Sequence, residues 1–283
     1  MSRVAVVQMN SLADVLYNMG EARLLVREAA ECGARLVLLP EMFMTLDGKA
    51  FQAIAADDGY VQQMAQWARE FNVWLVAGAV PQPSPDGDHR LRSACLVFDH
   101  RGHQVARYDK IHLFDVDIGD RQGSYRESDR FAPGQDLVVI DSPLGKLGLS
   151  ICFDLRFPEQ YRALAEAGAE VLLVPAAFTY KTGQVHWQTL LTARAVENQC
   201  FVVAANQCGW HDDKRQTWGH SCISKVVDLA DKAKAKRLFL YHHDPDQRDE
   251  AIDDKLETAQ TLLKERGSET VCIAPKERET FFI

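Results

Sequence analysis

The first two-thirds of the chain alternates short apolar runs with stretches of helical periodicity, and this alternation restricts the possible folds more than any other feature. Apolar runs of roughly four to eight residues are typical of strands that are covered on both faces. Stretches with apolar residues three and four positions apart are typical of amphipathic helices. The pattern therefore predicts an α/β layered fold, with strands sandwiched between helices.

The expected elements follow one another closely along the sequence. Strands are predicted at residues 4–7, 35–39, 73–80, 96–99, 104–108, 147–152, 170–174 and 200–205. Helices are predicted at residues 18–32, 60–71, 158–167 and 186–198. Pro81, Pro83 and Pro85 indicate a loop after strand 73–80, and Gly102 marks the turn of a hairpin.

Composition and charge exclude several classes of function. A net charge of −8 argues against a nucleic-acid partner, which usually requires a basic surface. No apolar run approaches the roughly 18 residues needed to span a bilayer, so we expect no membrane segment. The apolar run near the N-terminus is too short for the core of a signal peptide. We therefore expect a cytoplasmic protein.

The cysteines match neither a disulfide framework nor a thiolate metal site. The chain has 7 of them, an odd number, and no CxxC pair. Most are expected to be small buried residues. A catalytic role for any one of them therefore needs support from its sequence context.

Three reactive side chains come directly after predicted strands. Glu41 follows strand 35–39, Lys110 follows strand 104–108, and Cys152 ends strand 147–152. Ligands of open α/β sheets collect outside the carboxyl ends of the strands, so these three residues could share one crevice. At a strand-to-helix turn, backbone N–H groups and the positive helix end are expected to favour the thiolate of Cys152.

These residue types suit the hydrolysis of an amide. Cys152 can attack the carbonyl carbon, Glu41 can accept and return the proton, and the Lys110 ammonium can stabilise the oxyanion. Each charged residue also has a simpler interpretation, Glu41 as a carboxylate at a helix N-terminus and Lys110 as an exposed loop charge. Spacing alone leaves both interpretations open.

Several short sequence motifs resemble those of the nitrilase superfamily of carbon–nitrogen hydrolases. The resemblance lies in residues 39–43 (LPEMF), 108–115 (YDKIHLFD) and 150–159 (SICFDLRFPE), which are similar to the three catalytic blocks of the superfamily. Residues 182–187 (TGQVHW) and 193–200 (ARAVENQC) resemble the branch that contains deaminated glutathione amidase and ω-amidase. The resemblance covers residues 1–221.

The resemblance implies a four-layer α–β–β–α sandwich and a triad of Glu41, Lys110 and Cys152 that needs no metal or cofactor. It implies hydrolysis of a small linear ω-amide, such as deaminated glutathione, through a cysteine thioester acyl-enzyme. A further family glutamate corresponds to Glu127, which would help to position the substrate and Lys110. The expected partners are a small-molecule amide and further copies of the chain, in a homodimer or larger homo-oligomer.

Other residues are expected around the reactive group. The substrate-binding residues are expected to be Phe153, Phe178, Tyr180 and Thr182. The residues expected to pack or form hydrogen bonds, without reacting, are His112, His186 and Trp187.

Residues 222–283 depart from the pattern of the superfamily and are predicted to form a separate βα segment. Its expected elements are a helix at 223–235, a strand at 237–241, a helix at 249–266 and a strand at 270–274. Residues 236–245 (KRLFLYHHDP) resemble the last part of metallo-β-lactamase-fold hydrolases. The upstream His-x-His-x-Asp-His cluster that a binuclear metal site would need is missing, so no metal ligand is predicted.

Two alternatives remain at this point. The departure after residue 221 could leave a catalytically impaired nitrilase-like protein with a binding or structural role. The histidines of the last segment could instead belong to a metal-dependent hydrolase. Metal analysis separates the second alternative from a metal-free amidase, and an activity assay separates the first.

Overall fold

A computed structural model of the chain describes residues 3–117, 123–212, 216–217, 227, 230–231, 237–239 and 249–273. The chain divides into two compact units, Met1–Gly219 and His220–Ile283. The first unit contains all of the predicted reactive residues.

A six-stranded mixed sheet forms one half of the first unit. Its strands are β1 (Arg3–Val6), β2 (Ala34–Leu38), β3 (Trp74–Val76), β4 (Val80–Gln82), β5 (Arg92–Phe98) and β6 (Gln104–Asp109). Strands β1, β2 and β3 are parallel, and β5 is antiparallel to β3, β4 and β6. The hairpin of β5 and β6 is confirmed, and Gly102 takes a φ of +81° in its turn.

A four-stranded sheet in the order β12-β11-β10-β9 forms the other half. Its strands are β9 (Val139–Ser142), β10 (Gly145–Leu149), β11 (Val171–Ala176) and β12 (Phe201–Asn206). Strands β10, β11 and β12 are parallel, whereas β9 is antiparallel to β10. The remaining strands of the unit form two small pairs, β7 (Asp115–Asp117) with β8 (Ser124–Arg126) and β13 (Gly209–Trp210) with β14 (Gln216–Thr217).

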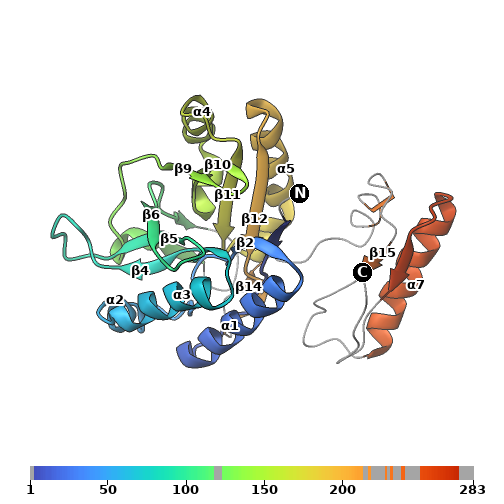
Figure 1. Cartoon of the computed structure of the whole chain (residues 1–283), viewed down its shortest axis with the longest axis horizontal. Helices are drawn as coiled ribbons and strands as arrows, with labels where there is room; N and C mark the ends of the chain where they lie inside the picture. Colours follow the sequence, from blue (N-terminus) through green and yellow to red (C-terminus); the bar gives the residue numbers. More distant parts are fainter. Residues whose placement is uncertain are drawn as a thin grey trace. The chain divides into compact units, whose positions relative to one another are not determined.

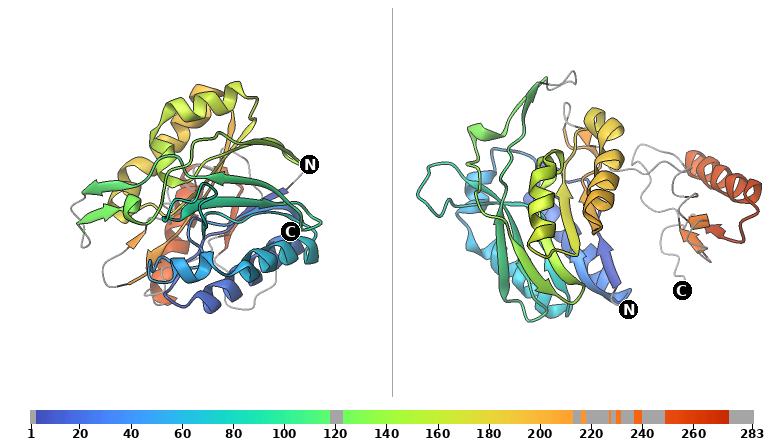
Figure 2. Two further views of the ribbon diagram at one scale, coloured as in Figure 1. Left: turned by 90° about the vertical axis from the view of Figure 1, so that its left-hand side faces the viewer. Right: turned by 90° about the horizontal axis from the view of Figure 1, so that it is seen from above.

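Helices cover the outer face of each sheet. The helices are α1 (Val15–Glu31), α2 (Phe51–Ala55), α3 (Asp58–Glu70), α4 (Pro158–Glu166) and α5 (Tyr180–Asn198). In Figure 1, α1 and α3 lie against the sheet of β1 to β6, and α4 and α5 lie against the sheet of β9 to β12. The views of Figure 2 show the same sequence of layers. The predicted four-layer α–β–β–α sandwich is therefore confirmed for the first unit.

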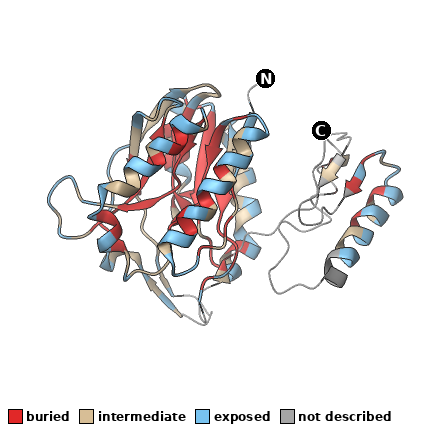
Figure 3. Cartoon of the chain, turned by 60° about the horizontal axis from the view of Figure 1, so that its bottom comes forward, coloured by how far each residue is buried: buried red, intermediate tan, exposed pale blue. Residues whose placement is uncertain are grey.

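Alternate residues of the central strands point to different layers. Leu36 and Leu38 of β2 belong to the cluster between the two sheets, whereas Val37 packs against α1 and α3. Both faces of this part of the strand are therefore removed from water, which explains the apolar run from Leu36 to Leu38. Figure 3 shows the central strands, such as β5 and β11, as buried and the outer faces of the helices as exposed.

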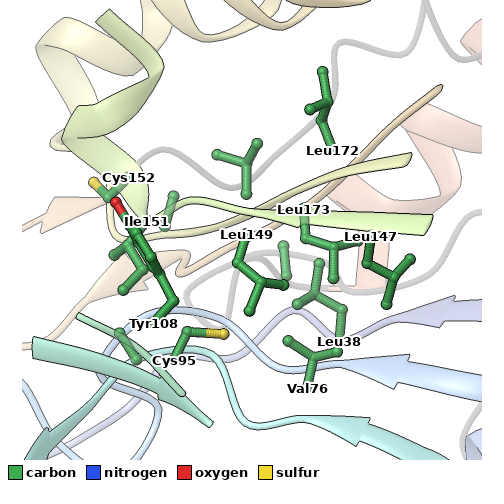
Figure 4. Close-up of a cluster of buried hydrophobic side chains, with 14 of the residues drawn as sticks. Leu38, Val76, Cys95, Tyr108, Leu147, Leu149, Ile151, Cys152, Leu172 and Leu173 are labelled. Atoms are coloured by element: carbon green, nitrogen blue, oxygen red, sulfur yellow. The ribbon is translucent and has the colours of Figure 1, made fainter. Parts of the chain in front are cut away.

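The core between the sheets ends at the reactive cysteine. In Figure 4, Leu38 and Val76 of one sheet face Leu147 and Leu149 of the other, and Cys152 lies at one end of this cluster. Burial of these side chains stabilises the fold by about 25 cal/mol for each Å² of apolar surface removed from water. The nucleophile candidate thus belongs to the buried cluster between the two sheets.

The single strand predicted at residues 73–80 is wrong, because the chain forms two short strands, β3 and β4. Both pair with β5, and β6 occupies the other edge of β5. Between them Gly78 takes a φ of +52°, and a Cβ atom there would lie 2.0 Å from the carbonyl oxygen of Pro40. The backbone therefore bulges toward the residue before Glu41, which only glycine permits at this distance.

Two of the further differences between predicted and observed boundaries affect residues near the reactive group. Helix α5 begins at Tyr180, six positions before the predicted start, so Tyr180 and Thr182 lie in its first turn and not in a loop. Strand β10 ends at Leu149, and Cys152 instead begins a 3₁₀ helix, η2 (Cys152–Arg156). The prediction missed the second of these because a buried apolar run does not reveal where its backbone turns.

The described part of the second unit contains the predicted order of strand, helix and strand. Strands β15 (Arg237–Phe239) and β16 (Val271–Ile273) are parallel and are connected through α7 (Asp249–Glu265). A small apolar cluster holds them together; its buried members are Val227, Ala259, Leu263 and Cys272. Most of the predicted helix 223–235 lies outside the described residues, and so does segment 240–248, which contains the histidines. The metallo-β-lactamase resemblance therefore stays a prediction.

Candidate active site

Glu41 lies three positions after the last residue of β2, and its backbone forms an isolated bridge with Ala79. The side chain is 5% exposed, and both carboxylate oxygens have partners. Oε1 accepts a hydrogen bond from Nζ of Lys110 at 2.8 Å, and Oε2 accepts one from the backbone N–H of Ala177 at 2.8 Å. The interpretation of Glu41 as a carboxylate at a helix N-terminus is therefore wrong. Its orientation is fixed by contacts with both halves of the sandwich.

Lys110 follows β6 and is not an exposed loop charge, since it is only 2% exposed. Its ammonium donates to Oε1 of Glu41 and also to Oε1 and Oε2 of Glu127, at 3.0 and 2.9 Å. Burial alone would lower the pKa of Lys110, but the charges of Glu127 and Glu41 outweigh it and raise the pKa well above its usual value. Lys110 therefore remains a cation throughout the physiological pH range.

Glu127 lies in the short 3₁₀ helix η1 (Glu127–Asp129), after β8. Besides Lys110, it accepts a hydrogen bond from the backbone N–H of Phe114 at 2.6 Å. Burial raises the pKa of Glu127, the Lys110 charge lowers it, and the nearby Glu41 charge raises it again. Two carboxylates thus share one buried ammonium beside the reactive group, and their proximity helps to raise the pKa of Glu127.

Cys152 occupies a strained position at the start of η2. Its φ is +46°, in the left-handed region that non-glycine residues rarely adopt. Burial raises the pKa of its thiol well above the usual value; the Glu41 charge adds to the rise, and the Lys110 charge opposes it. The backbone N–H of Ala177 lowers the pKa of the thiol, as expected of a nearby amide group, but burial outweighs it. A base is required to activate this thiol.

A buried carboxylate, which the sequence did not single out as functional, fixes the turn that carries Cys152. Oδ2 of Asp154 accepts hydrogen bonds from the backbone N–H of Ile151 at 2.8 Å and from the hydroxyl of Tyr108 at 2.6 Å. Oδ1 of Asp154 accepts the backbone N–H of His112 at 3.0 Å and lies 2.9 Å from its Nδ1. Asp154 therefore joins the Cys152 turn to the segment that carries Lys110.

The three residues predicted to pack or form hydrogen bonds, His112, His186 and Trp187, do so in the structure. The His112 ring stacks on Phe157 with 3.6 Å between the centroids, besides its contact with Asp154. Nδ1 of His186 lies 3.2 Å from the Arg156 guanidinium, and Trp187 packs edge-on against Phe178.

A cavity of about 470 Å³ opens above the three reactive side chains. Glu41, Lys110, Glu127 and Cys152 all line it. Of the predicted substrate-binding residues, Phe153, Phe178 and Thr182 line it too. Tyr180 does not belong to the lining, and it is 39% exposed on the first turn of α5.

The cavity is locally cationic within an acidic protein. Five basic side chains line it against four acidic ones, although the whole chain has 40 acidic and 32 basic residues. The basic residues that the sequence did not assign to the site are Lys49, Arg126, Arg130 and Arg156. Arg156 was within a recognised motif and could have been found by its position. Lys49 and Arg130 carry no such signal, because only the fold brings them to the cavity.

Comparison with protein families matches residues 3–226 to the carbon–nitrogen hydrolases. The chain belongs to the carbon–nitrogen hydrolase family. Deaminated glutathione amidase of Yersinia enterocolitica is 42% identical over 224 residues, which represent 78% of this chain and 78% of that protein. The family predicted from the three sequence motifs is thus confirmed.

Solved structures agree with this family assignment. The C. elegans NitFhit protein superimposes with a TM-score of 0.71 and 38% identity, over 78% of this chain and 56% of that chain. This carbon–nitrogen hydrolase therefore spans little more than half of that protein. A mutant amidase from Nesterenkonia sp. AN1, with acrylamide added at its active-site cysteine, has a TM-score of 0.66 and 27% identity over 76% of this chain and 82% of that chain.

The family and these relatives confirm the predicted reaction class. This carbon–nitrogen hydrolase is an enzyme that hydrolyses amide bonds other than peptide bonds. Within the described part of the chain, no helix is long and apolar enough to cross a membrane.

Proposed function

We propose that this hydrolase cleaves a small linear ω-amide, such as deaminated glutathione, with Cys152 as nucleophile, Glu41 as general base and acid, and Lys110 as oxyanion stabiliser. The observation that carries the assignment is the position of the Lys110 ammonium, 2.8 Å from Glu41 and 2.9 Å from Glu127 at the floor of the cavity that contains Cys152. A nucleophile, a proton acceptor and a fixed cation are the three groups that acyl transfer requires.

The first half of the reaction forms a thioester. Glu41 takes the thiol proton as Sγ of Cys152 bonds to the amide carbon, and the carbonyl electrons move to oxygen as an oxyanion that the Lys110 cation stabilises. The oxyanion then collapses, the carbon–nitrogen bond breaks, and Glu41 returns the proton to the departing ammonia or amine. The raised pKa of the Cys152 thiol makes this transfer to Glu41 necessary, since little thiolate exists beforehand.

The second half of the reaction regenerates the enzyme. Glu41 takes a proton from a water molecule, whose oxygen attacks the thioester carbon beside Lys110. Collapse of this second tetrahedral species breaks the carbon–sulfur bond, and the sulfur recovers the proton from Glu41. Glu127 holds Lys110 in place during both halves of the reaction, because both of its carboxylate oxygens accept hydrogen bonds from Nζ of Lys110.

Charge in the cavity supports an anionic substrate. The guanidinium of Arg156 lies over the rings of Phe153 and Phe178, 5.6 and 5.5 Å from their centroids, four residues after the nucleophile. A carboxylate on the acyl portion of the substrate can bind this cation while the amide carbon reaches Cys152. The Yersinia enterocolitica relative is named for deaminated glutathione, a compound that has an ω-amide and carboxylates at both ends.

The proposal is tested with a panel of small ω-amides. Purified enzyme is assayed for release of ammonia or amine, and intact-mass spectrometry detects an acyl group on Cys152. We expect turnover of the amides that carry a carboxylate and a transient adduct that Cys152→Ala lacks. Turnover that persists in Cys152→Ala would contradict the mechanism, and inactivity toward every amide would contradict the function.

We also place this enzyme in the cytoplasm as a homodimer or larger homo-oligomer. Large apolar side chains on α5 and at the start of β12 support self-association, since Val185, Val196 and Phe201 are 64%, 72% and 77% exposed. Light scattering at micromolar concentration tests the oligomeric state, and a monomer would contradict it.

A further inference from the structure

We infer that Lys49 and Arg130 form a carboxylate-binding subsite for the amine portion of the substrate, an inference that rests on the amidase function proposed above. The ligand class is an ω-amide whose nitrogen belongs to an amino acid or short peptide with a free carboxylate. A primary amide, which releases ammonia, would leave this subsite empty.

Two of the other cations in the cavity lining already have carboxylate partners, and the third, Arg156, is assigned above to the acyl carboxylate. Lys110 contacts two carboxylates, and Arg126 donates to both oxygens of Asp117 at 3.0 and 3.1 Å. Arg156 lies beside a histidine nitrogen and two aromatic rings. The side chains of Lys49 and Arg130 line the cavity without donating to any acceptor in the part of the chain that the structure describes. They are the charges left available for an anionic ligand.

The backbone of Arg130 is fixed at both ends of the residue. Its N–H donates to the carbonyl of Glu127 at 3.1 Å, and its carbonyl accepts from the N–H of Leu91 at 2.9 Å. Arg130 therefore extends from the same turn that holds Glu127 against Lys110. A ligand at Arg130 is thus held at a defined place relative to the reactive group, which is the condition for orienting a scissile bond.

The Arg130 side chain crosses Gly48 at close range. A Cβ atom built on Gly48 would lie 2.9 Å from Nε of Arg130 and 3.1 Å from its Cζ. The absence of a side chain at position 48 therefore leaves the space through which the guanidinium reaches the cavity. This contact also places the loop of Lys49 beside Arg130, because Lys49 is the next residue.

Lys49 belongs to a turn that local hydrogen bonds hold together. Oδ1 of Asp47 accepts the backbone N–H of Lys49 at 3.1 Å, and the Asp47 carbonyl accepts the N–H of Ala50 at 3.0 Å. Asp47 is the acidic residue of the cavity lining that is nearest to Lys49 in the sequence, and its Oδ1 and carbonyl oxygen already accept hydrogen bonds within this turn. The ammonium of Lys49 therefore remains available as the second donor of the subsite.

The subsite and Arg156 come from different segments of the chain. Lys49 and Arg130 are close in sequence to Phe51 and Phe131, which also line the cavity and whose rings are 5.4 Å apart. Arg156 lies at the end of η2, four residues after Cys152. A substrate with carboxylates at both ends can bind one at the subsite and the other at Arg156.

The test compares three amides that share one acyl group. The first is deaminated glutathione, the second is the same molecule with its glycine carboxylate converted to a neutral amide, and the third is the primary ω-amide. For Lys49→Gln and Arg130→Gln, we expect kcat/KM for the first amide to fall about tenfold, mostly through KM, as loss of a charged hydrogen bond implies. The values for the neutral and primary amides should change less than about twofold.

Two further variants separate local from general effects. Arg27→Gln removes the same charge from an exposed position on α1 and should leave all three amides unaffected. Gly48→Ala should displace the flexible Arg130 side chain and reproduce the selective loss while the chain keeps its fold. Each variant is first checked for an unchanged melting temperature.

The outcomes distinguish this inference from the proposed function. If the wild type hydrolyses the amides but Arg130→Gln and Lys49→Gln affect the charged and neutral ones equally, the subsite is overturned and the amidase stands. Equal KM values of the wild type for the charged and neutral amides would also overturn the subsite. If the wild type releases neither amine nor ammonia from any of them, the function and the subsite both fail.

Discussion

Tyr108 donates its hydroxyl hydrogen to Oδ2 of Asp154 at 2.6 Å, and this contact connects the strand before Lys110 to the turn of Cys152. Figure 4 shows the Tyr108 hydroxyl directed toward the end of the core where Cys152 lies. Because Asp154 also accepts the N–H of Ile151, one buried carboxylate holds both sides of the reactive group in register. The distance between nucleophile and cation is therefore set by a network and not by either residue alone.

Asp154 is expected to act as a positioning residue. Asp154→Asn keeps the shape but replaces an oxygen acceptor and removes the charge, so kcat should fall about 10²-fold with little change in KM. Tyr108→Phe should cost about 1–2 kcal/mol of stability and a smaller part of kcat. Steady-state kinetics and thermal melts measure both. A loss of stability without a change in kcat would show that the network has a purely structural role.

Cys152→Ala should fold normally and lose activity by several orders of magnitude, because it lacks the thiol proposed to form the acyl-enzyme. Cys32→Ser is the matched control, since Cys32 is exposed and lies outside the cavity. Amine release under saturating substrate measures both variants. Retention of more than about a tenth of the wild-type rate in Cys152→Ala would exclude Cys152 as the nucleophile.

Lys110→Met should lower kcat by roughly 10²-fold or more, the scale for loss of one oxyanion stabiliser. Because Lys110 is buried between two carboxylates, its removal should also destabilise the protein by about 3–5 kcal/mol at neutral pH. The strand-end position of Lys110 in the sequence predicts no such loss of stability, and this expectation is wrong because the side chain is buried.

The stability defect of Lys110→Met should depend on pH in a definite direction. The pKa of Lys110 is raised in the folded protein, so its contribution is complete below the unfolded pKa and is lost only above the raised folded value. In the variant, Glu41 and Glu127 must become neutral or repel each other, so its stability should fall as the pH rises from 5 to 8. Melting curves of both proteins measure this, and a pH-independent difference would contradict the shared-ammonium arrangement.

Alkylation of Cys152 should report the raised pKa of its thiol. When the pKa lies above the pH, the thiolate fraction and the alkylation rate grow about tenfold for each pH unit. Iodoacetamide labelling of Cys152, followed by peptide mass spectrometry between pH 6 and 9, should therefore show a continuous rise. A rate that is constant below pH 7 would indicate a preformed thiolate and remove the need for Glu41 as base.

Residues 222–283 are expected to bind no catalytic metal, despite His242, His243 and Asp244. Catalytic zinc typically takes three protein ligands and an open position, and adjacent histidines cannot readily direct both rings at one ion. Elemental analysis after dialysis and amidase assays in chelator test this directly. Stoichiometric zinc, manganese or iron, or activity lost to chelator and restored by metal, would contradict the prediction and the metal-free mechanism.

The sequence by itself determined the family, the layered α/β fold and the residues that meet at the reactive group. The apolar run of β2 predicted a strand covered on both faces. The motifs around Glu41, Lys110 and Cys152 resemble the catalytic blocks of the nitrilase superfamily. These inferences succeeded because burial periodicity and reactive motifs are local properties, contained within a few neighbouring residues.

The tertiary structure alone decided the electrostatics and the limits of the cavity. Gly78 breaks a predicted strand because of a close approach to Pro40, and Arg130 reaches the cavity because position 48 is a glycine. The raised pKa values of Cys152 and Lys110 likewise depend on burial and on carboxylates from other segments. The strength of these interactions depends on the distance between the charged groups. The sequence around one residue does not show how far it lies from residues in remote segments of the chain.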